Sequence, residues 1–154
     1  MVMIDKFSST LDSLMGYKVN LYIGEEVVKG KLVGVEEDHV IIENENNYIF
    51  YYNLSHIQAI TKNTKQFQAQ EFTGEIIATP SLQQVLDSLK LQWVTILCMN
   101  KQKFTGILSE INSEFTTLIN GEERIVIKLS HISHILKGYI KEENSSNTEN
   151  NQSN

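Results

Sequence analysis

Several features are scarce in this sequence of 154 residues, and each scarcity narrows what the chain can be. The single cysteine, Cys98, excludes an internal disulfide framework, although one thiol could still cross-link to another chain. No apolar run is long enough to span a bilayer, so we expect no membrane protein. Residues 1–6 show no basic segment followed by an apolar core and a cleavage site, which indicates synthesis and residence inside a cell.

Positive charge is also in short supply. Lys and Arg number 13 against 19 Asp and Glu, which gives a formal net charge of −6. An excess of negative charge opposes nonspecific attraction to nucleic acid phosphates or anionic lipid, so a basic partner is favoured instead. The hydrophobic share of 41% and the charged share of 21% are those of an ordinary globular protein.

What the sequence does contain is an internal repeat. The tetrapeptide Leu54-Ser55-His56-Ile57 returns as Leu129-Ser130-His131-Ile132 after 75 residues, and residues 11–14 fall on residues 86–89 at the same offset. Two identities in one register are hard to obtain by chance. We predict two copies of one small domain at residues 4–62 and 80–138, a linker at 63–79 and a disordered polar tail at 139–154. A copy of about 60 residues is near the lower limit for an independent core, so we expect the two copies to pack against and stabilise each other.

Each copy is predicted to consist of a short helix followed by five strands. Apolar residues three to four apart between residues 4 and 14 predict the first helix, which Gly16 closes. Ser81 and Gln84 match a capping box at the start of the second helix. Gly30 and Gly34 indicate a bulge or tight bend in the second strand. The expected strands are residues 19–23, 28–35, 40–42, 48–52 and 57–60, then 93–98, 104–111, 115–119, 124–129 and 132–136.

Two pairs of segments carry a resemblance: residues 29–35 with 51–57 in the first copy, and 89–94 with 129–132 in the second. A short helix before five bent strands, with Gly-x-Leu in the second strand, resembles the Sm-like small barrel. The tandem arrangement is similar to the spore coat protein B family of endospore-forming bacilli, whose repeats carry Lys-Gly-x-Leu and end in a His-Ile pair. Some relatives continue into long tails rich in Ser, Lys and Arg, whereas residues 141–154 here are acidic and rich in Asn.

The resemblance implies a mainly β fold of two tandem Sm-like barrels, each with a short N-terminal helix and five bent antiparallel strands. It also implies a structural component of the endospore coat, made in the cytoplasm of the mother cell and deposited in the coat. Other spore coat proteins and further copies of this chain, in a homo-oligomer, are then the expected partners. The polar tail could keep the chain soluble before assembly or reach a basic partner.

Assembly would use strand edges, because an unpaired edge is a template for a neighbour's strand. We expect the contact in the strands around residues 48–52 and 124–129, whose aromatic and β-branched residues suit pairing, although these edges could also join the two copies to each other. The candidate interaction residues are Tyr48, Tyr51, Tyr52, Arg124, Val126 and Lys128. The repeated motif, with a hydrogen-bonded histidine that positions the last strand, comprises Leu54, Ser55, His56, Ile57, Leu129, Ser130, His131 and Ile132.

A cytoplasmic Sm-like adaptor that binds RNA is the alternative function. RNA-binding members place an Asp and an Asn after the second strand and a basic-Gly pair before the last strand. Residues 36–40 lack the Asn, and residues 53–56 stand where the basic-Gly pair should be. The second copy has an Asn at position 112, but residues 128–131 again supply no Gly. With an acidic chain besides, we expect no nucleic acid partner.

Reactive groups are few. His131 and His134 would face opposite sides of a strand, and no Cys or carboxylate accompanies the histidines at a recognised ligand spacing. His39 is expected to be exposed in a turn, and Cys98 to be a buried small hydrophobic residue. No nucleophile elbow, phosphate-binding glycine loop or carboxylate pair is visible. We therefore expect no enzymatic activity, no cofactor and no metal.

Overall fold

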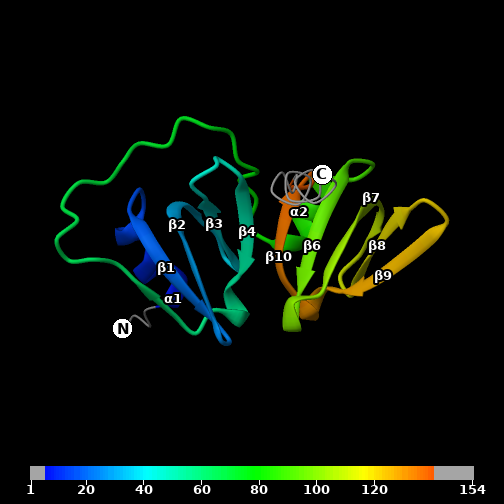
Figure 1. The fold of residues 1–154 in the computed structure, drawn as a ribbon, viewed down its shortest axis with the longest axis horizontal. Helices are drawn as coiled ribbons and strands as arrows, with labels where there is room; N and C mark the ends of the chain where they lie inside the picture. Colours follow the sequence, from blue (N-terminus) through cyan, green and yellow to red (C-terminus); the bar gives the residue numbers. More distant parts are fainter. Residues whose placement is uncertain (1–5, 141–154) are drawn as a thin grey trace, which may run out of the picture.

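A computed structural model describes residues 6–140 of the chain. Ten antiparallel strands form one sheet in the order β5-β1-β2-β3-β4-β10-β6-β7-β8-β9, which Figure 1 shows as two strongly curved halves that meet where β4 lies beside β10. The predicted mainly β architecture is confirmed. The strands are β1 (Lys18–Ile23), β2 (Glu26–Val35), β3 (His39–Glu43), β4 (Ile49–Asn53), β5 (Ala59–Thr61), β6 (Trp93–Cys98), β7 (Lys103–Ile111), β8 (Phe115–Asn120), β9 (Glu123–Lys128) and β10 (Ile132–Lys137).

Two short α-helices precede the two groups of strands. Helix α1 (Phe7–Leu11) continues into a 3-10 turn, η1 (Asp12–Leu14), and Gly16 follows in the left-handed conformation with φ +85°. Helix α2 (Leu82–Ser88) begins with the predicted capping box, in which Ser81 and Gln84 satisfy each other's backbone N–H groups. The remaining 3-10 turns are η2 (Leu54–His56), η3 (Met99–Lys101) and η4 (Leu129–His131). Residue 4, where the first helix was predicted to begin, lies outside the described residues.

The second strand of each half contains a register shift, and only the shift in β2 lies at a glycine. The pairing of β2 with β3 shifts register between Leu32 and Gly34, and the pairing of β7 with β8 shifts between Leu108 and Glu110. A bulge of this kind bends its strand and increases the local twist. The bend predicted at Gly34 is therefore present, and a matching bend occurs in the other half of the sheet.

Two hydrophobic clusters fill the concave sides of the sheet. Each cluster includes residues from both halves. The cluster around α2 includes Ile41 and Tyr51 from β3 and β4. The cluster around α1 includes Leu136 from β10. Neither cluster is complete with the residues of one half alone, as expected for units with so few residues.

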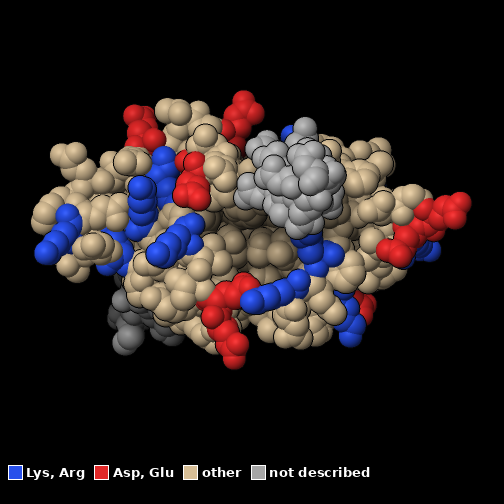
Figure 2. Space-filling model, viewed as in Figure 1, with Lys and Arg blue, Asp and Glu red and all other residues tan. Residues whose placement is uncertain are grey.

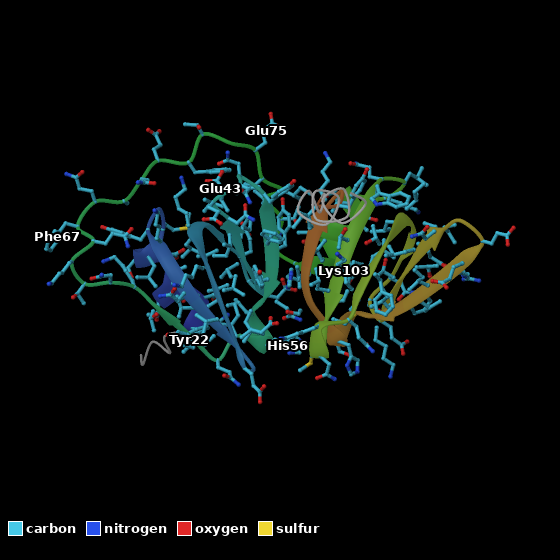
Figure 3. All side chains as sticks on the ribbon, viewed as in Figure 1. Tyr22, Glu43, His56, Phe67, Glu75 and Lys103 are labelled. Carbon is cyan, nitrogen blue, oxygen red and sulfur yellow. The ribbon has the colours of Figure 1, made fainter. Side chains whose placement is uncertain are left out.

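The segment between β5 and α2 contains neither helix nor strand among the described residues and runs around the outside of the first half (Figure 1). Hydrogen bonds attach this segment to β1: the Gln66 side chain accepts the Lys18 N–H at 2.9 Å and donates to the Lys18 carbonyl at 3.2 Å. Gln70 N–H also donates to the Gly16 carbonyl. Phe67, between these contacts, points into solvent and is 82% exposed (Figure 3).

Several details differ from the sequence-based expectations; Tyr48, predicted to open a strand, precedes β4. His39 was predicted to be exposed, which is wrong: it is fully buried as the first residue of β3. Strand β5 begins at Ala59 rather than at residue 57, and Leu129 belongs to η4 rather than to β9. Residues 141–154 of the predicted disordered tail lie outside the described residues.

Candidate interaction surfaces

Strand β10 connects the two halves of the sheet, because it pairs with β6 on one side and with β4 on the other. The edge of β4 is therefore occupied within the chain. Two alternatives were open for this strand from the sequence, namely contact with a neighbouring molecule or pairing with the other copy, and the structure shows the second. In this pairing the β10 residues His134, Ile135 and Leu136 lie opposite the β4 residues Tyr52, Tyr51 and Phe50 respectively.

Aromatic rings pack across this junction. The centroid of the His134 ring lies 4.4 Å from that of Tyr52 and 5.7 Å from that of Phe50. Burial lowers the pKa of His134 from 6.5 to about 4 and raises the pKa of the Tyr52 phenol. His134 is therefore neutral at pH 7 and packs as an aromatic ring rather than as a charge.

The candidate tyrosines contribute to the interior. Tyr51 and Tyr52 are each 3% exposed, and Tyr48 is half-buried against the cluster around α1. The Tyr51 hydroxyl accepts the backbone N–H of Ile77 at 2.9 Å, which ties the connecting segment to β4. Tyr51 and Tyr52 therefore stabilise the junction and offer little outer contact surface, whereas Tyr48 precedes β4 and keeps part of its side chain exposed.

The repeated tetrapeptides form matching 3-10 turns that meet at the same junction. In η2, His56 Nε2 donates to the carbonyl oxygen of Ser130 in η4 at 3.0 Å, and Figure 3 shows His56 on the side of the first half that faces the second. Asn53 Nδ2 donates to the Ile132 carbonyl, also at 3.0 Å. His131, the equivalent of His56, is exposed, and its side chain has no hydrogen bond within residues 6–140.

The two ends of the sheet are β5 and β9. On β9, Val126 is 58% exposed in the middle of the strand. Lys128 is exposed, and Arg124 lies 3.6 Å from the carboxylate of Glu110. The three candidate residues of β9 are therefore all accessible, in contrast to the buried Tyr51 and Tyr52.

A broad open groove of about 1060 Å³ lies between β1, β2 and the connecting segment. Figure 2 shows several Lys or Arg side chains over this half of the molecule. Lys18, Lys29 and Lys31 line the groove, but so do Glu43 and Glu45, and the Lys31 ammonium lies 3.4 Å from the Glu43 carboxylate. The charges largely compensate each other, so the groove does not form a basic surface.

The described residues contain no group of three or more His, Cys, Asp or Glu side chains that could hold a metal ion. Cys98 is buried in β6, and burial raises the pKa of its thiol, which disfavours the reactive thiolate. Between residues 6 and 140, no helix is both long and apolar enough to cross a bilayer.

Asp38 is a connecting residue that the sequence did not reveal. Its carboxylate accepts the Leu82 N–H at the start of α2, at 3.0 and 3.2 Å, and lies 2.7 Å from Nδ1 of the buried His39. It therefore joins the turn between β2 and β3 to the second helix. The three acidic residues of this turn look alike in the sequence, and no local pattern indicates a partner 44 residues away.

Comparison with known proteins gives one informative relative. No family model matches the sequence. The chain is similar to spore coat protein B of Bacillus subtilis (strain 168), with 27% identity over 115 residues. The similarity covers 74% of this chain and 30% of that protein, so the chain spans less than a third of the length of this relative.

Proposed function

We propose that this chain is a structural component of the bacterial endospore coat, made in the mother cell and deposited in the coat, where it associates with other coat proteins. Its role would be non-enzymatic. In this proposal the chain consists of two tandem Sm-like barrels, corresponding to β1–β5 and β6–β10, whose strand orders are the same. The observation that carries the proposal is the similarity to spore coat protein B.

The two ends of the sheet support a role in assembly. Strand edges carry unpaired N–H and C=O groups, which add a further strand readily unless charge or covering segments prevent it. Both β5 and β9 are end strands, and β9 presents an exposed apolar side chain, Val126, at its centre. Protein-protein contacts by strand addition are therefore the mechanism we propose for coat assembly.

The alternative RNA-binding function is disfavoured by what the loop residues do. Asn53 and His56 occupy positions where RNA-binding barrels of this kind are expected to carry a basic-Gly pair. Both side chains instead donate hydrogen bonds to backbone carbonyls of the second half. The hydrogen-bonding groups of Asn53 and His56 are therefore used in the junction between the halves and are not free to bind a nucleotide.

Deposition on the spore tests the proposal directly. The full chain, fused to a fluorescent protein and expressed in the mother cell of sporulating Bacillus subtilis, is expected to form a shell around the spore and to be recovered in coat extracts. The fluorescent protein alone is the control and should remain diffuse. A fusion that is equally diffuse in the mother cell would contradict the coat assignment.

A second experiment separates assembly from RNA binding. Light scattering during size-exclusion chromatography, at low and high salt, gives the mass of the purified chain, and the ratio of absorbance at 260 and 280 nm reports bound nucleic acid. We expect an oligomer without nucleic acid that persists at high salt. A monomer that carries RNA at low salt and releases it at high salt would support the adaptor instead, because phosphate contacts weaken steeply with salt.

A further inference from the structure

We propose that the groove between β1, β2 and the connecting segment binds an uncharged polysaccharide chain. The inference goes beyond the proposed coat function, because it assigns a ligand to one half of the molecule and does not depend on how copies or partners assemble. The groove is open to solvent and has a volume of about 1060 Å³. This volume is at the upper end of the range for drug-sized ligands, so the groove has room for more than one sugar ring.

Side-chain carboxamides are the commonest polar groups in the lining of the groove. Six Asn or Gln residues line it, namely Asn20, Asn44, Asn47, Asn63, Gln66 and Gln70. A carboxamide is uncharged and carries both donors and an acceptor, and a hydroxyl group is likewise a donor and an acceptor. The lining therefore matches a ligand that is uncharged and rich in hydroxyl groups.

The fold holds two of these carboxamides by their oxygen atoms alone. Asn44 Oδ1 accepts the N–H groups of Asn46 and Tyr48 at 3.0 and 2.9 Å. Asn63 Oδ1 accepts the Lys65 N–H at 2.9 Å. The Nδ2 groups of Asn44 and Asn63 make no hydrogen bond within residues 6–140. Two donors are thus fixed in position before a ligand arrives, which lowers the entropic cost of binding.

The connecting segment supplies three of the six carboxamides, those of Asn63, Gln66 and Gln70. It runs around the outside of the first half (Figure 1), and Gln66 attaches it to β1 through two hydrogen bonds with Lys18. These residues lie in the linker that the repeat predicts between the two copies. The groove therefore belongs to the first half and is not a feature of each copy.

The second half indicates that the fold does not require a polar lining here. Lys18, Lys31 and Glu43 lie opposite one another on β1, β2 and β3. The corresponding row on β6, β7 and β8 is apolar and consists of Trp93, Ile107 and Ile119. Because the same arrangement of strands forms with an apolar row, folding does not explain the polar row of the first half. Contact with a hydrated ligand does explain it.

The charges in the groove favour an uncharged ligand over a polyanion. Three lysines and two glutamates line it, and the Lys31 ammonium already lies 3.4 Å from the Glu43 carboxylate. A nucleic acid or an acidic polysaccharide would bring its negative charges beside these carboxylates. An uncharged chain avoids this repulsion, and its affinity should not fall as salt rises.

Apolar carbon is also available for packing in the groove. Its lining includes Val28, which is partly exposed, and the rings of Phe50 and Tyr52, whose centroids lie 6.1 Å apart. The C–H groups of a sugar ring can pack against such carbon atoms while its hydroxyl groups contact the carboxamides.

Isothermal titration calorimetry of the full chain tests the proposal. Chitohexaose, cellohexaose and maltohexaose are the uncharged probes, and poly(U) RNA and polygalacturonate are the anionic comparisons. We expect at least one uncharged probe to bind with the same affinity at low and high salt. No binding of any of the three, or tighter binding of either polyanion, would overturn the proposal.

Isosteric variants locate the site. Asn44→Asp keeps the Oδ1 acceptor and replaces the free Nδ2 donor by a second acceptor, so it should weaken saccharide binding by about fivefold, corresponding to one lost hydrogen bond. Asn112→Asp is the matched control, because Asn112 Oδ1 also accepts two backbone N–H groups, those of Glu114 and Phe115, in a turn of the second half. It should leave the affinity unchanged. Equal effects of the two variants would overturn the assignment of the groove.

A second variant keeps the test independent of the turn at Asn44. The Gln70 side chain makes no hydrogen bond in the described part of the chain, so Gln70→Ala should fold normally and should also weaken binding by about fivefold. Urea unfolding verifies that each variant is folded. An unchanged affinity of folded Gln70→Ala and Asn44→Asp would place the saccharide elsewhere and overturn the proposal.

This inference and the proposed function can fail separately. Deposition of the fluorescent fusion on the spore, by a chain that binds no uncharged probe, would overturn the groove assignment and leave the coat role standing. Saccharide binding in the groove, with a fusion that stays diffuse, would support the groove assignment and overturn the coat role.

Discussion

Acidification from pH 7 to pH 5 should destabilise this fold through His134. Its imidazole packs against Phe50 and Tyr52, and burial lowers its pKa from 6.5 to about 4. The unfolded chain takes up a proton as the pH falls through 6.5, whereas the folded chain remains neutral at this site until the pH approaches 4. Stability therefore falls across this window, and the His134 contribution to the loss between pH 7 and pH 5 is about 2 kcal/mol.

Urea unfolding followed by the fluorescence of Trp93 measures this loss, and a His134→Gln variant isolates its source. The variant and the unaltered chain carry the same carboxylates, so the difference between their pH dependences belongs to position 134. His131→Gln is the matched control, because the His131 side chain is exposed, and it should keep the original pH dependence. Equal losses for His134→Gln and the unaltered chain would refute the reasoning.

Three further predictions concern the stability of the monomer, measured by urea unfolding at pH 7. His56→Ala should lower the free energy of unfolding by about 1 kcal/mol, because it removes the hydrogen bond between the halves, whereas His131→Ala should leave it unchanged. Leu86→Ala should cost about 2–5 kcal/mol, because Leu86 is fully buried, and Leu91→Ala, at a position 75% exposed, should cost far less. Ser81→Ala should cost about 1 kcal/mol through loss of the capping box on α2. Equal effects of the two histidine variants or of the two leucine variants, or no effect of Ser81→Ala, would contradict the respective assignment.

Local patterns predicted features that depend on short stretches of sequence, such as the alternation of buried residues along β1. The strand at residues 93–98 was predicted with the bounds that β6 has, and the capping box at residues 81–84 is present. These features depend on neighbours in the sequence. Alternation and cap residues record such short-range requirements directly.

The contacts between the halves could not be predicted in the same way. Tyr51 and Tyr52 are both buried because β4 lies between β3 and β10, a position that depends on residues more than 80 positions away. His39 was taken for a turn residue because three acidic residues precede it, yet Asp38 and the strands around it enclose the ring. A hydrogen-bonded histidine was expected at the turn of each copy: His56 makes this bond, whereas the exposed His131 side chain makes none within residues 6–140. The sequence also did not indicate that the partner of His56 lies in the other copy.

The central place of β10 also affects how the chain is made. The strand that completes the middle of the sheet is the last of the described strands to be synthesised, and its partner β4 ends at Asn53. At a synthesis rate of about 5–20 residues per second, β4 waits roughly 5–15 s for residues 132–137. During this interval a nascent first half exposes a complete, aromatic strand edge. Two chains on one messenger could exchange their last strands at this stage, so crowded translation would itself favour entwined products over separate molecules.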